Sequence, residues 1–198
     1  MLNNKFLEKT LILVISGPSG SGKSTLCKKI LEDNFNFKLS VSLTTRKKRT
    51  LETNGIEYNF TTKEEFQNMI NNLELIEYAK IYENFYGTHK STIENSIKGR
   101  YNLLFDINPI GNFAIKEYCK NIRNIIFINI YVMPPSIEEL KQRLISRGDA
   151  IESINLRLSH ALEEMKFSHQ YDYIITNINI ENSYAQIKKI LEKYFYIY

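Results

Sequence analysis

The sequence predicts an α/β fold in which a parallel sheet is flanked by helices and carries a smaller inserted lobe. An apolar strand over residues 10–16 leads through a glycine-rich loop into a helix. From residue 101 onward, apolar strand-like runs alternate with helical segments, which is the rhythm of a parallel sheet. Residues 37–90 instead hold short strands and polar stretches. With 198 residues, the chain is long enough for one such domain with a sizeable core.

The glycine-rich loop after the first strand is the most specific local pattern. It reads G-x-x-x-x-G-K-S and precedes a helix expected over residues 25–32. In this context the pattern predicts a phosphate-binding loop, in which backbone N–H groups and a helix N-terminus point at phosphate oxygens. Lys23 would bridge the β- and γ-phosphates, and the Ser24 hydroxyl would ligate Mg2+. The expected nucleotide-binding residues here are Gly17, Pro18, Ser19, Gly20, Ser21, Gly22, Lys23, Ser24 and Thr25.

The inserted stretch predicts short elements. We expect strands at residues 39–44 and 58–61, followed by a helix that opens on the capping box Thr62-x-x-Glu65. A strand at 74–81, a turn at 84–88 and a helix that opens at Ser91 and ends at Gly99 complete this part.

The rest of the chain predicts strands at 101–107, 125–132 and 173–176. The helices between and after them are expected at 111–119, 136–147, 154–167 and 183–196. Asp106 comes near the end of an apolar strand, where an acid can hold Mg2+ directly or through water. This interpretation depends on the phosphate loop, because apolar runs that end in Asp are common.

Two sets of arginines indicate a further anionic group. Arg46 and Arg49 lie in a polar stretch after a strand, and with Tyr58 they would suit a phosphomonoester. Arg143, Arg147 and Arg157 lie around a helix end, a loop and the next helix. Arginines on a mobile segment can neutralise charge on a transferring phosphoryl group. For each arginine, a surface salt bridge is the alternative.

Composition narrows the function classes. The net charge of +4 suits anionic ligands but is too small for a dedicated nucleic-acid binder, and we expect no nucleic acid partner. No apolar run approaches the length of a membrane span, so we expect no membrane association. Cys27 and Cys119 match no metal-ligand spacing and fit a reducing compartment. A cytoplasmic location is the resulting expectation.

With these segments in place, the chain resembles the guanylate kinases. The most specific match is S-V-S-L-T-T-R-K-K-R-T-L-E at residues 40–52, continuing through Asn54 and Gly55 to Tyr58. It is similar to the family pattern S-V-S-x-T-T-R-x-P-R-x-x-E…G-x-x-Y. Supporting matches lie at residues 75–79, 86–88, 106, 134–136, 147–148 and 175–177. The resemblance covers nearly the whole chain, from about residue 11 to the last helix.

This resemblance implies a single domain over residues 1–198 and a phosphotransferase of purine nucleotide metabolism. The γ-phosphoryl group of ATP, with Mg2+ as cofactor, would pass to GMP and dGMP. The core would comprise 10–36 and 91–198, with a helical lid at about 143–157, and 37–90 would form the GMP-binding lobe. The small-molecule partners would be these nucleotides, and the protein would be a monomer or a small homo-oligomer.

The resemblance also implies a role for each matching residue. The GMP phosphate would be held by Arg46, Arg49, Tyr58 and Tyr86, and the guanine read by Ser42, Glu77 and Thr88. Glu52 would order the arginine loop, while Gly87, Asp106 and Asn108 would complete the GMP site. Asn177 would lie near the ATP adenine. The catalytic charges would be Lys23, Arg46, Arg143, Arg147 and Arg157.

Three departures from the family pattern affect these expectations. Asn108 replaces an acid that helps to read guanine, which puts guanine affinity in doubt. Lys48 replaces a proline between two arginines, and the lid between Gly148 and Ser153 is one residue short. Two alternatives stay open: a non-catalytic guanylate-kinase-like scaffold module that binds a phosphorylated peptide, and a kinase of another nucleoside monophosphate.

Overall fold

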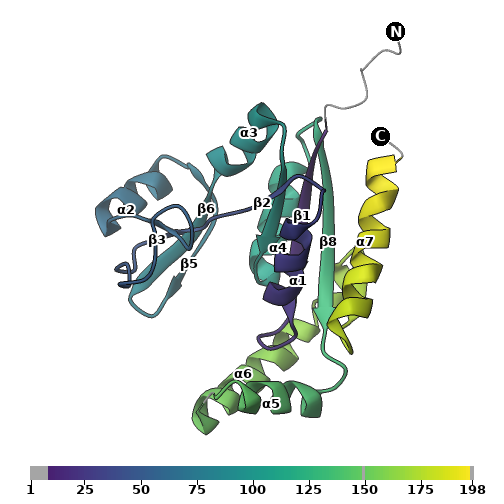
Figure 1. Ribbon diagram of the computed structural model, residues 1–198. Coiled ribbons are helices and arrows are strands. Elements are labelled where there is room, and N and C mark those ends of the chain that lie inside the picture. The colour runs from purple at the N-terminus through teal and green to yellow at the C-terminus, as the bar shows by residue number, and fades with distance from the viewer. Residues whose placement is uncertain (1–8, 149, 197–198) are drawn as a thin grey trace.

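The computed structural model describes residues 9–148 and 150–196 as an α/β core with a lobe on one side and a helical pair at one end (Figure 1). The core sheet has the strand order β2-β7-β1-β8-β9, and every neighbouring pair is parallel. The expected parallel sheet is therefore confirmed. Its strands are β1 (Thr10–Ser16), β2 (Phe37–Leu39), β7 (Asn102–Asp106), β8 (Ile125–Met133) and β9 (Tyr173–Thr176).

Helices cover both faces of the core sheet. Alternate residues of β1 point to opposite faces, so this strand packs against the helices on both sides. Leu13 and Ile15 pack with α1 (Lys23–Glu32) and α7 (Ile180–Tyr196). Ile12 and Val14 pack on the other side with α3 (Lys90–Gly99) and α4 (Pro109–Cys119). A strand buried on both faces reads as a continuous apolar run, which is what residues 11–15 show.

The lobe is a second, mixed sheet with the strand order β4-β3-β6-β5. Its elements are β3 (Leu43–Thr44), β4 (Asn59–Phe60), α2 (Lys63–Asn71), β5 (Leu75–Ile81) and β6 (Asn84–His89). Phe66 of α2 is fully buried and stacks on Phe85 of β6, with ring centroids 5.4 Å apart. The predicted capping box at the start of α2 is present, since Thr62 and Glu65 bond to each other's backbone N–H.

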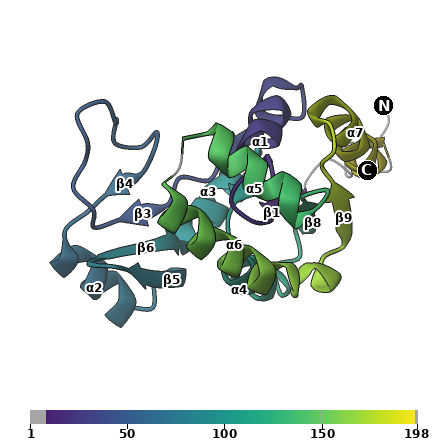
Figure 2. The same cartoon turned by 90° about the horizontal axis from the view of Figure 1, so that it is seen from below.

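Helices α5 (Ile137–Ser146) and α6 (Ile151–Met165) lie across the end of the core, as the view from below shows (Figure 2). Ser136 caps α5 as expected, accepting from the Glu139 N–H at 3.1 Å. A short 3-10 turn, η1 (Ser168–Gln170), leads from α6 to β9. Asp149, inside the expected lid, lies outside the described residues. In the described part of the chain, no helix is long and apolar enough to cross a bilayer.

Three local predictions are wrong. Residues 84–88 form strand β6 rather than a turn, because they pair with β5 and β3 on both sides. His89, not Ser91, caps α3: its Nδ1 accepts from the Ser91 N–H at 3.0 Å. The expected strand at 39–44 is two strands in different sheets. Since β2 pairs with β7, residues 37–39 belong to the core sheet and not to the lobe.

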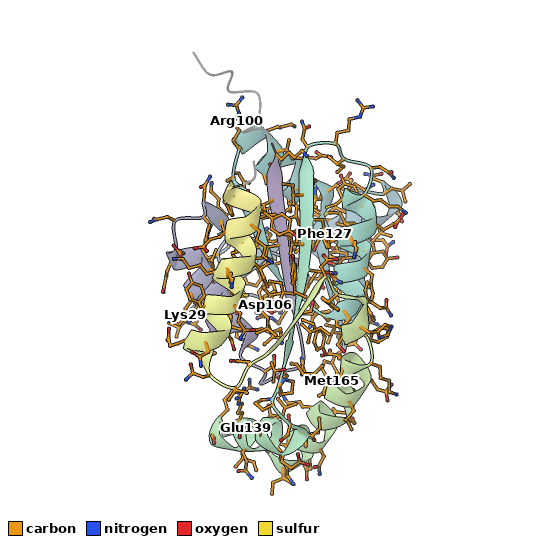
Figure 3. All side chains as sticks on the ribbon, turned by 90° about the vertical axis from the view of Figure 1, so that its right-hand side faces the viewer. Lys29, Arg100, Asp106, Phe127, Glu139 and Met165 are labelled. Atoms are coloured by element: carbon orange, nitrogen blue, oxygen red, sulfur yellow. The ribbon has the colours of Figure 1, made fainter. Side chains whose placement is uncertain are left out.

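The topology brings the polar sequence motifs to one end of the core. Strands β1 and β7 are parallel neighbours with Ile15 opposite Asp106, so the phosphate loop after β1 lies beside that carboxylate. Ligand sites in such sheets lie at the carboxyl ends of the strands. Figure 3 shows Asp106 in the core above α5 and α6, where Glu139 and Met165 are labelled, and Arg100 at the opposite end.

Candidate active site

The phosphate loop spans residues 17–22 and delivers the chain into the first turn of α1. Gly22 occupies the cap position with a φ of 96°, and among the described residues no side chain caps the helix there. A Cβ at Gly22 would lie 2.3 Å from Asn177 Nδ2, so the close approach requires glycine. The first-turn N–H groups of α1 are left available for an anion.

Lys23 folds back over this loop. Its Nζ donates a hydrogen bond of 2.9 Å to the Pro18 carbonyl. Burial lowers the pKa of Lys23, and the negative charges of Asp106 and Glu164 oppose that shift. The ammonium group is thus held against the backbone of the loop.

Ser24 and Asp106 are brought together, as a shared Mg2+ site requires. The Ser24 hydroxyl donates to Asp106 Oδ2 at 2.9 Å. A hydroxyl and a carboxylate are hard oxygen ligands of the kind that Mg2+ prefers. In the described part of the chain no group of three or more His, Cys, Asp or Glu could hold a metal. Mg2+ is commonly bound through one or two protein ligands together with phosphate oxygens and water.

Arg157 contacts the phosphate loop, and Arg143 contacts Asn177, which is bonded to that loop. Arg157 of α6 donates to Ser19 Oγ at 2.8 Å and to Ser153 Oγ at 3.1 Å. Arg143 of α5 donates to the Asn177 carbonyl at 2.9 Å and pairs with Glu139. Arg147 follows α5 directly, and its charge contributes to the lowered pKa of Lys23.

The arginine loop of the lobe is organised by one carboxylate. Arg46 makes a two-pronged ion pair with Glu52, with N···O distances of 2.6 and 3.0 Å. The same carboxylate accepts from the Arg49 N–H at 2.8 Å. Hydrogen bonds from Arg46 and from the Arg49 backbone lower the pKa of Glu52. Arg46 also lies over the Tyr58 ring, 5.3 Å from its centroid, which in turn packs on Tyr86.

A cleft of about 680 Å³ separates the lobe from the core. Glu77 of β5 contributes a carboxylate to its wall and accepts a 2.7 Å hydrogen bond from the buried Thr88 hydroxyl. Burial raises the pKa of Glu77, and the Thr88 hydrogen bond opposes this. The cleft is lined by Ser42, Tyr58, Glu77, Ala79, Ile81, Tyr86, Gly87, Ile107, Asn108, Gly111 and Arg157.

Asn177 lies behind the phosphate loop rather than in an open pocket. Its side chain donates to the Ser21 carbonyl at 2.7 Å and accepts from the Ser183 hydroxyl at 2.9 Å. The residue is 1% exposed, and its amide is engaged at both ends. In this geometry Asn177 supports the loop, with its backbone carbonyl bound by Arg143.

Comparison with known proteins agrees with this geometry. A sequence model described as guanylate kinase matches residues 9–194. The chain belongs to the guanylate kinase family. It is 46% identical over 187 residues to a guanylate kinase of Clostridioides difficile (strain 630), covering 94% of this chain and 89% of that protein. It is 42% identical over 185 residues to a guanylate kinase of Rickettsia bellii (strain RML369-C), covering 93% and 94%.

A solved structure leads to the same family. The crystal structure of guanylate kinase from Anaplasma phagocytophilum is 34% identical in sequence to this chain and superposes with a TM-score of 0.69. The match covers 94% of this chain and 86% of that one. The expected α/β fold class, a parallel core sheet flanked by helices with an inserted mixed lobe, is thereby confirmed.

Two residues that contact or act on the candidate site were not predicted from the sequence. Glu164 lies on α6, seven residues after Arg157, and its charge acts on Lys23. That spacing places both residues on one helix face, so the position of Glu164 relative to Arg157 could have been predicted from the sequence. Ser183 is buried near the start of α7 and donates to Asn177, six residues earlier in the chain, a contact that no sequence motif indicates.

Proposed function

We propose that the protein transfers the γ-phosphoryl group of Mg2+-bound ATP to the α-phosphate of GMP or dGMP, giving ADP and GDP or dGDP. The observation that carries this proposal is the pairing of two sites. A phosphate loop with a joined Ser24–Asp106 pair lies at the same end of the core as a cleft walled by Glu77.

At the donor site, backbone N–H groups of residues 17–25 and the Lys23 ammonium would hold the ATP phosphates. Ser24 and Asp106 would hold Mg2+, Asp106 directly or through water, and the ion would neutralise charge on the phosphates. Asn177 would act through the loop that it supports, because its amide already binds Ser21 and Ser183.

At the acceptor site, the guanidinium groups of Arg46 and Arg49 with the hydroxyls of Tyr58 and Tyr86 would bind the GMP phosphate. Glu52 keeps Arg46 in place, as the two-pronged pair indicates. Ser42, Glu77 and Thr88 would bind the guanine, with Gly87 and Asn108 beside them in the cleft wall. The Glu77 carboxylate would accept from the N1–H and 2-amino group, which adenine does not present together.

Catalysis would then consist of positioning, charge neutralisation and exclusion of water. The attacking phosphate oxygen is already anionic, so it needs no general base. Negative charge on the transferring phosphoryl group would be neutralised by the guanidinium groups of Arg143, Arg147 and Arg157. The Arg157 bond to Ser19 shows that the α6 arginine reaches the phosphate loop. Closure would keep water from competing as the acceptor.

This function places the protein in purine nucleotide metabolism with nucleotides as its partners. The two cysteines are buried free thiols, which suits the reducing cytoplasm as the site of the reaction. The intact Lys23, Ser24 and Asp106 set speaks against a non-catalytic scaffold module. We retain the expectation of a monomer or a small homo-oligomer.

The test is ADP release from Mg2+-ATP with GMP, dGMP, AMP and UMP compared in a coupled assay. We expect turnover with GMP and dGMP and little with AMP or UMP. Lys23→Ala should abolish most of this turnover while leaving the melting temperature nearly unchanged. Equal turnover with all four nucleotides, or full activity of the Lys23 variant, would contradict the proposal.

A further inference from the structure

Strand β5 carries an irregularity directly before the Glu77 carboxylate. Along most of the β5–β6 hairpin the pairing is regular, with Glu77 opposite Thr88. At the open end of the hairpin, away from its turn, Leu75 lies opposite His89, so Ile76 is an extra residue in β5. Such an insertion is a β-bulge, which bends a strand and changes the direction of the side chains beside it. Glu77 is the first regularly paired residue after this bulge.

The bulge affects which face of the hairpin each side chain of β5 occupies. After the bulge, Glu77, Ala79 and Ile81 alternate along the strand and line the cleft. The extra residue, Ile76, packs against the buried cluster on the α3 and α4 side of the core sheet. Because successive side chains of a strand point to opposite faces, a slip in pairing by one residue would turn Glu77 away from the cleft.

His89 fastens the open end of the hairpin beside the bulge. Its Nδ1 accepts the Ser91 N–H at 3.0 Å, so in the neutral ring the proton lies on Nε2. Nε2 then donates to Glu74 Oε2 at 3.2 Å. The Glu74 carbonyl accepts the Lys90 N–H at 2.9 Å, which adds a backbone bond between the same two segments. One imidazole thus caps α3 and holds the start of β5 against the end of β6.

The two ends of the hairpin are held by different means. At the tip, a two-residue turn with Tyr82 at a φ of 53° joins the strands, and a tight turn fixes the register near it. At the open end the bulge interrupts the ladder, and the Glu74–His89 hydrogen bond joins the strands beyond it. Without this bond the strand end would separate back to the bulge, where Glu77 is the next residue.

We propose that His89 is a positioning residue for the base: through Glu74 it holds the bulge that directs the Glu77 carboxylate into the cleft. This inference rests on the proposed function, in which Glu77 accepts hydrogen bonds from guanine. In the described part of the chain, His89 is not among the residues that line the cleft. Its loss should therefore weaken GMP binding and base selection without slowing phosphoryl transfer at saturating GMP.

A set of variants separates the hydrogen bond to Glu74 from the cap of α3. Asn caps helices well but is too short to bond Glu74 from the cap position, so His89→Asn removes the bond and keeps the cap. Glu74→Ala removes the same bond from its other end, whereas Glu74→Gln keeps an oxygen that can accept it. The double variant Glu74→Ala/His89→Asn completes a cycle, because two changes that break one interaction are not additive.

Thr62→Ala is the matched control. Thr62 caps α2, another helix of the lobe, by accepting the Glu65 N–H at 3.1 Å. Its loss should lower the melting temperature without changing base selection. For each protein we would measure the melting temperature, the KM for GMP, the KM for ATP and kcat, together with the ratio of kcat/KM for GMP over AMP.

We expect His89→Asn and Glu74→Ala to raise the KM for GMP by about tenfold, because a misdirected Glu77 loses hydrogen bonds to guanine. The GMP-to-AMP ratio of kcat/KM should fall by about the same factor, while kcat and the KM for ATP change little. The double variant should resemble either single variant. Glu74→Gln should resemble the wild type, since its amide oxygen can still accept the Nε2–H.

The outcomes separate this inference from the proposed function. An unchanged KM for GMP in both His89→Asn and Glu74→Ala, with GMP still phosphorylated, would overturn the role of His89 alone. If His89→Asn fails to fold, the Glu74 variants still decide, because equal losses in Glu74→Ala and Glu74→Gln would contradict the hydrogen bond. Absence of ADP release by the wild type with GMP would overturn the proposed function itself, and this inference with it.

Discussion

The Ser24 hydroxyl donates a hydrogen bond to Asp106 Oδ2 over 2.9 Å, although the two residues are 82 positions apart in the chain. The contact joins the first turn of α1 to the end of β7. It exists because β1 and β7 are parallel neighbours with Ile15 opposite Asp106. The parallel pairing of the two strands therefore brings these two side-chain oxygens together.

Removal of either member of this pair should weaken the response to Mg2+. We expect Ser24→Ala and Asp106→Asn to raise the Mg2+ concentration needed for half-maximal turnover by on the order of tenfold to a hundredfold. Titration of MgCl2 at fixed ATP and GMP measures this. Ser146→Ala serves as a control, because its hydroxyl donates to the Gln142 carbonyl within α5 at an exposed position. An unchanged Mg2+ response in both site variants would refute the assignment.

Turnover should depend on the ionisation of Glu77, whose pKa lies above its ordinary value. Burial raises the pKa of this carboxyl above its ordinary value of 4.5. Because only the ionised form accepts two hydrogen bonds from the base, kcat/KM for GMP should fall as pH drops through the raised pKa. Glu77→Gln should lose this dependence and lower kcat/KM by about 10- to 100-fold.

The acceptor phosphate also titrates near neutral pH, so the Glu77 comparison needs both pH profiles. The phosphate contribution is shared by the wild type and Glu77→Gln and cancels in their ratio. A ratio that stays constant as the pH falls from neutral to 4.5, the ordinary value of the carboxyl, would show that Glu77 does not read the base in its charged form.

An ion pair between α1 and α7 should make stability depend on acid pH. Lys188 and Tyr184 donate hydrogen bonds to Asp33 and lower the pKa of Asp33 from 3.8 to about 2. A depressed carboxyl pKa stabilises the fold above pH 3.8, and this contribution disappears as pH falls toward 2. Asp33→Asn should thus melt at a lower temperature at pH 7, with a gap that narrows on acidification.

Thermal melting of the wild type and Asp33→Asn from pH 7 to pH 3 tests this. A gap in melting temperature that widens toward acid pH would contradict the predicted loss of the Asp33 contribution. The Asp33 side chain is 19% exposed, so added salt should also reduce the gap.

The loop geometry predicts unequal effects at two glycines. Gly22 and Gly148 have similar positive φ angles of 96° and 83°. A Cβ at Gly22 would meet Asn177 Nδ2 at 2.3 Å, whereas nothing described lies within 4 Å of one at Gly148. Gly148→Ala should cost about 1 kcal/mol of unfolding free energy from backbone strain alone. Gly22→Ala should cost more, on the order of 2–4 kcal/mol, because it also displaces Asn177.

Chemical denaturation of both glycine variants measures this difference. Equal losses of unfolding free energy in Gly22→Ala and Gly148→Ala would mean that the Asn177 side chain moves away from the new Cβ at little energetic cost. ATP binding adds a second check, since only the Gly22 variant should lose affinity.

The sequence predicts the core well because its local patterns agree with its long-range pairing. The run at residues 11–15 is apolar on both faces, and strand β1 is buried on both faces. The lobe is less predictable. Residues 84–88 contain Gly87 and polar side chains, which indicate a turn, but pairing with β5 and β3 makes them a strand. Local preference is overridden here by tertiary contacts.

The candidate site likewise has some features that the sequence predicts and others that it does not. The spacing of G-x-x-x-x-G-K-S makes the phosphate loop visible in the sequence, and the two-pronged Arg46–Glu52 pair lies within six residues. The amide orientation of Asn108 depends on α4, and the engagement of Asn177 depends on Ser21 and Ser183. The Asn177–Ser21 contact joins segments 156 residues apart, and the contacts of Asn108 and Ser183 depend on how α4 and α7 begin, so the motif does not reveal them.

The measurement that tests the central claim most directly follows the phosphorus atom itself. ATP labelled at the γ-phosphate is incubated with the protein, Mg2+ and GMP, and the nucleotides are separated. The account predicts label in the β-phosphate of GDP in equal amount to the ADP formed, and almost none in the Lys23→Ala reaction. Label released as inorganic phosphate at the same rate with and without GMP would contradict it.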